Sequence, residues 1–298
     1  MEKSVLKCPV CEDELFWGDA VCKCDNGHSF DISKRNYVNL ILANQKRSMI
    51  SGDNRQTVQA RDDFLNNGHY KELSDSVNLI VSDFLRVDRG KTNHILDIGC
   101  GSGETAAYLH SEYGLRITGI DRSVDSISKA NEMHPYHEFT VGDGQFLDFE
   151  SRSFDCVLME CTLSLMSNPV EAVHEAYCVL KDGGFLIIHD VYLPNPTAED
   201  FAALDQTIKA IEGSRSSGDC CDDHPSAHVV DGALVLNEIN AEMNELGLSV
   251  KVFEDRKLDL DNYAATVVFN GGSLEDLCWT AKDKSKVSYF LLILKKEK

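Results

Sequence analysis

Apolar and polar positions along residues 93–298 follow two alternating patterns. Short apolar runs, typical of buried strands, alternate with stretches whose apolar positions recur every three or four residues, as in helices. The runs predict strands near 93–98, 116–121, 137–141, 154–159 and 184–190, and the periodic stretches predict helices near 104–112, 123–133, 168–180 and 199–212. The run Lys181-Asp182-Gly183-Gly184 is expected to end a helix before the fifth strand. Further strands near 249–254 and 287–295, the last antiparallel, would complete a mostly parallel, Rossmann-like α/β sheet of seven strands with helices on both faces.

Glycines follow the first predicted strand in the pattern Asp97-x-Gly99-x-Gly101-x-Gly103. Glycine lets the backbone approach a nucleotide closely, and Asp121, at the end of the second strand, could bind two ribose hydroxyls. A hydride-transfer dehydrogenase would be expected to carry G-x-G-x-x-G instead. The pattern resembles motif I of the class I S-adenosylmethionine (SAM) methyltransferases. The resemblance implies that SAM lies against the three glycines, with Asp121 on its ribose and Asp143 near its adenine amine, unless Asp143 only stabilises a turn.

Four metal-ligating side chains occur in two close pairs near the N-terminus. Cys8-Pro9-Val10-Cys11 is followed, after a loop of hairpin length, by Cys24 and His28. This spacing is typical of a tetrahedral zinc site in which all four ligands come from the protein, so the metal would be structural. Cys22 is the alternative to Cys24, which is preferred because its three-residue gap to His28 lets both side chains turn back onto one ion.

The first quarter of the chain also carries motifs of one family. His28-Ser29-Phe30-Asp31, Lys34-Arg35-Asn36-Tyr37-Val38-Asn39-Leu40, Gly52-Asp53 and Ala60-Arg61-x-x-Phe64-Leu65-x-x-Gly68-His69-Tyr70 follow the first cysteines. Residues 8–77 thereby resemble the N-terminal module of the bacterial large-subunit rRNA guanine-N1 methyltransferases. The resemblance implies a zinc ribbon that helps to hold an RNA hairpin, with Cys8, Cys11, Cys24 and His28 as ligands. The expected organisation is a ribbon over 1–40, a helical linker over 41–85 and a methyltransferase domain over 86–298.

The segment expected to face the methyl group departs from that family. It reads Met159-Glu160-Cys161-Thr162, where the guanine-N1 enzymes usually carry an aromatic residue and a proline. Cys161 resembles instead the cysteine of arsenite methyltransferases and related small-molecule enzymes. Further thiolates, which are soft metalloid ligands, could come from Cys220-Cys221 in the 213–232 loop and from Cys278, with His224 and His228 near the first pair. Cys161 could equally be a small core side chain.

The two acceptors differ in their need for a base. N1 of guanine must lose a proton, which Glu160, Asp190 or Asp143 could accept, whereas an arsenic lone pair or a thiolate needs no base. Glu160 and Cys161 are therefore the candidate catalytic residues. Methylation of rRNA guanine is favoured over methylation of arsenite or a thiol, and a SAM-binding protein without turnover is the third option.

Charge and composition narrow the setting. The net charge is −20, and residues 71–298 carry nearly all of it, which weighs against nucleic acid as the partner of that part alone. Residues 34–61 are the exception, with a net charge of +5 that suits either a solvated surface or a phosphate-contacting patch. No apolar run is long enough to span a bilayer, and no signal-peptide core follows the N-terminus, so a cytoplasmic protein without a membrane partner is expected. The sequence leaves the oligomeric state open, with a homodimer as one option.

Overall fold

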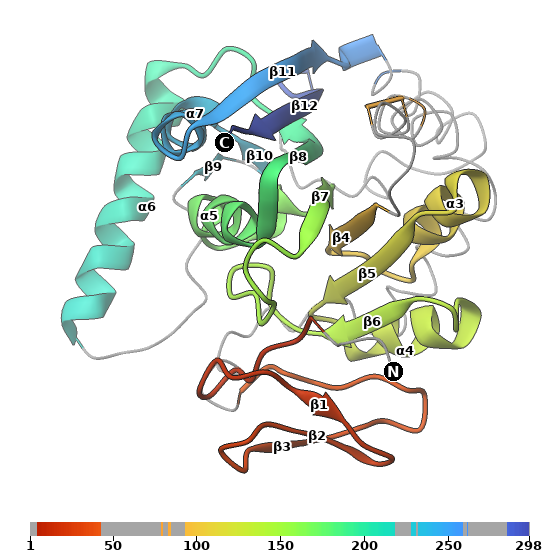
Figure 1. Ribbon diagram of the computed structural model, residues 1–298. Coiled ribbons are helices and arrows are strands. Elements are labelled where there is room, and N and C mark those ends of the chain that lie inside the picture. Colours follow the sequence, from red (N-terminus) through yellow and green to blue (C-terminus); the bar gives the residue numbers. More distant parts are fainter. Residues whose placement is uncertain are drawn as a thin grey trace, which may run out of the picture.

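The computed structural model describes residues 5–42, 79, 83–84, 93–217, 228–230, 232–258, 261 and 285–297. Figure 1 shows an α/β domain with a small β-ribbon, coloured red, beneath it. The predicted boundaries at residues 40 and 85 stay predictions, because most of the intervening linker lies outside the described residues. Among these residues, no helix is both long and apolar enough to cross a membrane.

The domain is built on a central sheet whose main path runs β11-β12-β8-β7-β4-β5-β6. Its strands are β4 (His94–Ile98), β5 (Arg116–Asp121), β6 (Glu138–Val141), β7 (Phe154–Glu160), β8 (Leu180–Tyr192), β11 (Leu248–Asp255) and β12 (Ser288–Lys296). The strands from β6 to β8 pair in parallel, and β12 pairs antiparallel with both β8 and β11. The predicted Rossmann-like sheet and its antiparallel last strand are confirmed. The chain order reverses at β4, which lies between β5 and β7, and open α/β sheets bind ligands at such a point.

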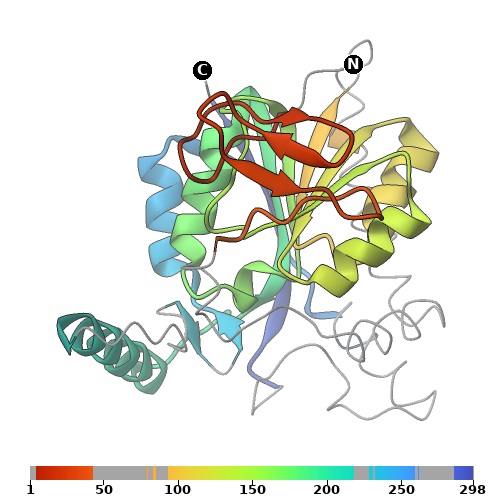
Figure 2. The ribbon, with the colours of Figure 1, turned by 90° about the horizontal axis from the view of Figure 1, so that it is seen from below.

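Helices cover both faces of the sheet (Figure 2). One face carries α3 (Glu104–Tyr113) and α4 (Val124–Met133), and the other carries α5 (Pro169–Val179) and α7 (Leu236–Glu245), while α6 (Ala198–Ser217) projects outward. Short polar caps fix where two of them begin, since Ser123 accepts a hydrogen bond from the Ser126 amide and Asn168 one from the Glu171 amide. Pro169 follows Asn168 in the first turn of α5, where its missing N–H costs nothing.

Two details of the β8 region differ from the sequence prediction. The run Lys181-Asp182-Gly183-Gly184 lies inside β8 instead of preceding it, and the pairing with β7 shifts register between Phe154 and Cys156. Gly183 has a φ of 82°, so a left-handed glycine absorbs the irregularity within the strand. The second difference is a small hairpin of β9 (Val229–Val230) and β10 (Ala233–Leu234), which adds to the end of β8 where a loop was expected.

The ribbon is an antiparallel sheet of β1 (Phe16–Trp17), β2 (Val21–Lys23) and β3 (Ser29–Asp31). Its buried side chains do not form a core of their own. Leu6, Leu15, Val38 and Leu40 belong to the same buried cluster as Ile98 of the central sheet. Ribbon and domain therefore share one core, because a module this small buries too little surface alone.

Candidate active site

The glycine run crosses the end of β4 at the point where the strand order reverses. Gly101 has a φ of 54°, and a Cβ added there would meet nothing within 4 Å, so its backbone faces open space. Gly99 is different, because its Cβ would lie 2.2 Å from Thr162 Oγ1 in the segment after β7. Gly103 would likewise meet Phe139 of β6 at 2.7 Å. The sequence assigned all three glycines to ligand approach, whereas the structure leaves Gly101 facing open space and packs the other two against side chains.

Asp121 lies at the end of β5, directly beside this loop. Its Oδ2 accepts a hydrogen bond of 3.0 Å from the Gly101 amide, and its Oδ1 accepts one of 2.7 Å from the Ser123 amide. The carboxylate therefore ties the glycine loop to the start of α4. This is the position from which an acid at the end of the second strand can reach ribose hydroxyls.

The segment after β6 brings the third predicted acid to the same end of the sheet. Asp143 is buried, its Oδ2 lies 3.3 Å from Arg122 Nη1, and its Oδ1 accepts a hydrogen bond of 3.0 Å from the Gln145 amide. Gln145 Oε1 in turn accepts hydrogen bonds of 2.9 Å from Ser167 Oγ and 2.6 Å from the Asn168 amide. Asp143 thus has both a turn-stabilising role and a place beside Asp121. Gln145 links it to the segment after β7.

Three acidic side chains surround the glycine loop. Burial, with a smaller contribution from the nearby carboxylates of Glu160 and Asp121, raises the pKa of Asp97 to about 8. Glu160, at the end of β7, accepts a hydrogen bond of 2.9 Å from Thr105 Oγ1 in the first turn of α3. Such a concentration of negative charge suits a cationic ligand, since a cation would favour the ionised form of Asp97.

Cys161 forms an unusual turn at the end of β7. Its φ is 51°, a left-handed conformation that is costly for a residue with a Cβ, and its amide donates a 2.7 Å hydrogen bond to the His189 carbonyl. The thiol Sγ lies 2.8 Å from the hydroxyl oxygen of Tyr289 in β12. Cys161 is therefore neither a loose surface thiol nor a simple core side chain.

His189 and Asp190, at the end of β8, complete the surroundings of that turn. The His189 ring packs edge-on against the Tyr289 ring at 4.7 Å, and neither ring nitrogen has a hydrogen-bond partner among the described residues. Burial lowers the pKa of His189 to about 3, so the ring is neutral. Asp190 accepts hydrogen bonds of 2.9 Å and 2.7 Å from the Ser164 amide and hydroxyl. Its carboxylate holds the segment after β7 in place.

The four predicted metal ligands converge in the ribbon. Each offers one ligand atom, and these atoms all lie within 4.8 Å of one another: Cys8, Cys11, Cys24 and His28. Cys8 Sγ lies 3.5 Å from His28 Nδ1, Cys11 Sγ lies 3.6 Å from Cys24 Sγ, and Cys24 Sγ lies 3.4 Å from His28 Nδ1. A tetrahedron with Zn–S of about 2.3 Å and Zn–N of about 2.0 Å has edges of about 3.5 to 3.8 Å, so this donor set fits Zn²⁺. Cys22 lies outside the group, buried in β2.

Several predicted features lie outside the described residues. These are Cys220, Cys221, Cys278 and His224, together with the basic residues Lys46, Arg47, Arg55 and Arg61. His228 is described, and its Nδ1 lies 3.0 Å from Glu238 Oε2. Arg35 is also described, and its guanidinium contacts α4, so it serves the packing of the ribbon.

Two family models match the chain. Residues 96–188 match the model described as "Methyltransferase domain", and residues 6–49 match the model described as "RlmA, N-terminal", a zinc ribbon. The α/β part is a class I methyltransferase domain. The predicted combination of this domain with that ribbon is confirmed, and with it SAM as the methyl donor of the fold and zinc as the metal of the ribbon.

Two curated relatives of this chain are named for the methylation of a guanine in 23S rRNA. The chain is 31% identical over 150 residues to the "23S rRNA (guanine(748)-N(1))-methyltransferase" of Streptomyces fradiae. The matched stretch covers 48% of this chain and 51% of that protein. It is 30% identical over 195 residues to the "Putative 23S rRNA (guanine-N(1)-)-methyltransferase YxjB" of Bacillus subtilis (strain 168). This match covers 62% of this chain and 63% of that protein. The chain thus matches between about half and three fifths of the length of these relatives.

A solved structure supports the fold alone. Geranyl diphosphate C-methyltransferase from Streptomyces coelicolor A3(2) has a TM-score of 0.52 at 14% identity, covering 73% of this chain and 78% of that one. The methyltransferase domain therefore shares its fold with this enzyme.

Sequence reasoning missed the side chains that the fold brings to the site from a distance. Tyr289 contacts Cys161 across 128 positions of the chain, and Thr105 contacts Glu160 across 55. Gln145 and Arg122 were also missed, although each follows a predicted strand end. The position after a strand end was a usable signal for those two. Nothing local marked Tyr289.

Proposed function

We propose that this chain transfers a methyl group from SAM to N1 of a guanine in large-subunit rRNA, with an rRNA hairpin as its partner in the cytoplasm. One observation carries the proposal: an RlmA-type ribbon at residues 6–49 and a methyltransferase domain at 96–188 occur in one chain, and relatives named for this reaction are about 30% identical to it. The ribbon would hold the RNA while the domain presents the methyl group.

The donor would lie across the glycine loop. Gly101 would offer its open backbone, Asp121 would bind the ribose hydroxyls, and Asp143 would lie near the adenine amine; the open space at Gly101 and the bond of Asp121 to the Gly101 amide support this assignment. Gly99 and Gly103 keep the loop close to the segments that carry Thr162 and Phe139. SAM supplies an electrophilic methyl group, so the remaining task of the chain is to align the nucleophile and exclude water.

Guanine N1 needs a base, and Glu160 is the carboxylate that we assign to this role. Asp190 accepts both hydrogen bonds from Ser164, and Asp143 faces Arg122, so both already serve the local structure. Glu160 lies at the end of β7, in the segment expected to face the methyl group, and accepts a hydrogen bond from Thr105. It would accept the N1 proton as the methyl group is attacked.

Cys161 favours a second candidate function, methylation of arsenite or a small thiol. Its thiol lies at the end of β7, in a strained turn and within 2.8 Å of the Tyr289 hydroxyl. Thiolates are suitable ligands for arsenite, and an arsenic lone pair attacks without a base.

One assay separates the two functions. The protein is incubated with methyl-labelled SAM and either unmethylated 23S rRNA or arsenite plus glutathione. Label at guanine N1 supports the first proposal, and label only in the arsenic product overturns it. Glu160→Gln should lower RNA methylation by roughly 100-fold or more, the range of a lost general base, whereas Cys161→Ser should lower it little. The reverse pattern is expected if arsenite is the acceptor.

A further inference from the structure

The ribbon contacts the methyltransferase domain at the elements that carry the SAM site. It pairs with the exposed edge of the sheet, where the Leu40 amide donates a 2.9 Å hydrogen bond to the Val141 carbonyl and the Val141 amide donates one of 3.0 Å to the Val38 carbonyl. Val141 is the last residue of β6, two positions before Asp143. The ribbon therefore adds a short parallel pairing to β6 just where the strand turns into the site.

A second attachment lies on the other side of Asp143. The Lys7 amide donates a 2.8 Å hydrogen bond to the Asp148 carbonyl, and the Glu150 amide donates one of 2.8 Å to the Val5 carbonyl. Residues 142–147, which we name the Asp143 loop, thus lie between two main-chain attachments to the ribbon. The loop has little room to move on its own, because a Cβ at Gly144 would meet Ile98 Cγ2 at 2.6 Å and Met166 Cε at 2.7 Å.

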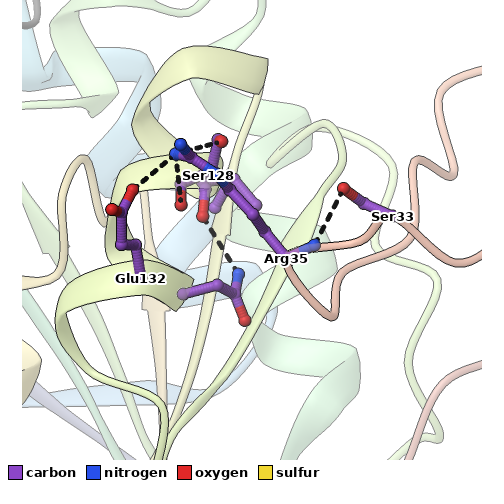
Figure 3. A network of polar contacts seen from close by, with 6 residues as sticks. Ser33, Arg35, Ser128 and Glu132 are labelled. Carbon is purple, nitrogen blue, oxygen red and sulfur yellow. Dashed lines mark hydrogen bonds and ion pairs between the residues drawn. The ribbon is translucent and has the colours of Figure 1, made fainter.

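The third contact holds α4, the helix that begins just after Asp121. Arg35 Nη1 lies 2.7 Å from Glu132 Oε2 and donates a 2.9 Å hydrogen bond to Ser128 Oγ, as Figure 3 shows. Ser33 accepts a hydrogen bond from the Arg35 amide and fixes the turn from which the side chain extends. The ribbon thereby contacts both α4 and the ends of the Asp143 loop, the two segments that we assign to the adenosine part of SAM.

One zinc ligand is adjacent in sequence to a residue of the second attachment. Cys8 follows Lys7, the residue that bonds Asp148, and its sulfur lies beside His28 at the far end of the ribbon. Without a metal, the segment 5–8 would lose its bonds through the ion to the hairpin that carries Cys24 and His28, and would keep its pairing to residues 14–15. A small zinc module takes much of its folding free energy from metal binding.

We propose that the zinc ribbon is a positioning element of the SAM site, through Arg35 on α4 and the two attachments that flank the Asp143 loop. This inference rests on the SAM-binding part of the proposed function and not on the RNA acceptor. Zinc occupancy then sets the affinity for the donor, even when no RNA is present.

The first test compares zinc-loaded and chelator-stripped protein without RNA. S-adenosylhomocysteine binding by titration calorimetry should weaken by roughly tenfold on zinc loss, within the usual range of coupling between two binding sites. Amide hydrogen exchange should speed up over residues 138–150 and stay slow in β8 and β12. Equal affinity with and without zinc would overturn the inference. Failure of the zinc-loaded protein to bind at all would overturn the SAM assignment as well.

The second test keeps the zinc in place, so that loss of the ribbon fold cannot explain the result. Arg35→Ala should weaken S-adenosylhomocysteine binding by roughly two- to fivefold with an unchanged zinc content, since it removes one exposed ion pair and its hydrogen bonds. Arg152→Ala is the matched control, because it removes an exposed ion pair with Asp182 at the opposite end of the sheet. Arg35→Lys should restore part of the affinity. Equal affinities in Arg35→Ala and Arg152→Ala would contradict the proposal.

Discussion

The donor and acceptor halves of the proposed active site are built in different ways. The donor half, at the ends of β4, β5 and β6, consists of a glycine loop and acids that lie in or within two positions of predicted strands. The acceptor half, at the ends of β7 and β8 and the start of β12, depends on the contact of Cys161 with Tyr289 and on the buried ring of His189. The donor half thus has a local basis in the sequence, and the acceptor half has a long-range one. Variants in the first should change SAM binding and stability, and variants in the second should change turnover.

The largest effect is expected from Gly99→Ala in the donor half. The new Cβ would lie 2.2 Å from Thr162 Oγ1 at a φ of 76°, so overpacking and backbone strain add. Thermal and urea unfolding should show a loss of about 3 kcal/mol or more. Gly101→Ala is the control, because its Cβ would meet nothing within 4 Å and only the strain of about 1 kcal/mol remains. Similar losses in both variants would mean that the contact with Thr162 does not matter.

A pH-dependent affinity for SAM is the second prediction. Burial and the neighbouring Glu160 and Asp121 raise the pKa of Asp97 from 3.8 to about 8, and a bound cation favours the ionised carboxylate. The affinity should therefore rise with pH, by up to about tenfold per unit, until it levels off above pH 8. Calorimetry across this range checks the slope, and Asp97→Asn should flatten it. Methylthioadenosine, which has neither the sulfonium nor the ammonium, should show no such rise.

The same raised pKa has the opposite effect on the ligand-free fold. Between pH 4 and 8 folded Asp97 holds its proton more tightly than the unfolded chain does, so its contribution to the unfolding free energy falls as pH rises through this window. The Asp97→Asn variant should lose less stability than the parent protein between these pH values.

In the acceptor half, Tyr289→Phe should separate turnover from donor binding. The substitution keeps the ring against His189 and removes the hydroxyl that lies 2.8 Å from Cys161 Sγ. Single-turnover methylation should slow by roughly tenfold, with the affinity for S-adenosylhomocysteine changed by less than about twofold. A matching loss of donor affinity would erase the distinction between the two halves.

The smallest expected effect concerns the strained turn. Cys161→Gly should raise the unfolding free energy by about 0.5 to 1 kcal/mol, because glycine adopts a φ of 51° without penalty. Arg152 has a φ of 54° on the surface, so Arg152→Gly should give a gain reduced only by the loss of its exposed ion pair with Asp182, with unchanged turnover. A gain in stability together with slower methylation by Cys161→Gly would show that the turn exists for function. If stability falls instead, packing of the thiol outweighs the strain.

The sequence by itself determined the order of strands and helices, the glycine loop with Asp121 and Asp143, and the spacing of the zinc ligands. Each of these depends on neighbours a few residues apart, where periodicity and backbone preference act directly. It also assigned the N-terminal module to its family, since those motifs are local strings.

Only the tertiary structure decided how these parts meet. Arg35 reaches Ser128 across 93 positions, and Tyr289 reaches Cys161 across 128. Such contacts depend on the order and register of the strands, which a one-dimensional pattern does not specify. The docking of the ribbon on β6 and the different uses of Gly99 and Gly101 follow from the same cause, because both depend on what the folded chain brings to a given point in space.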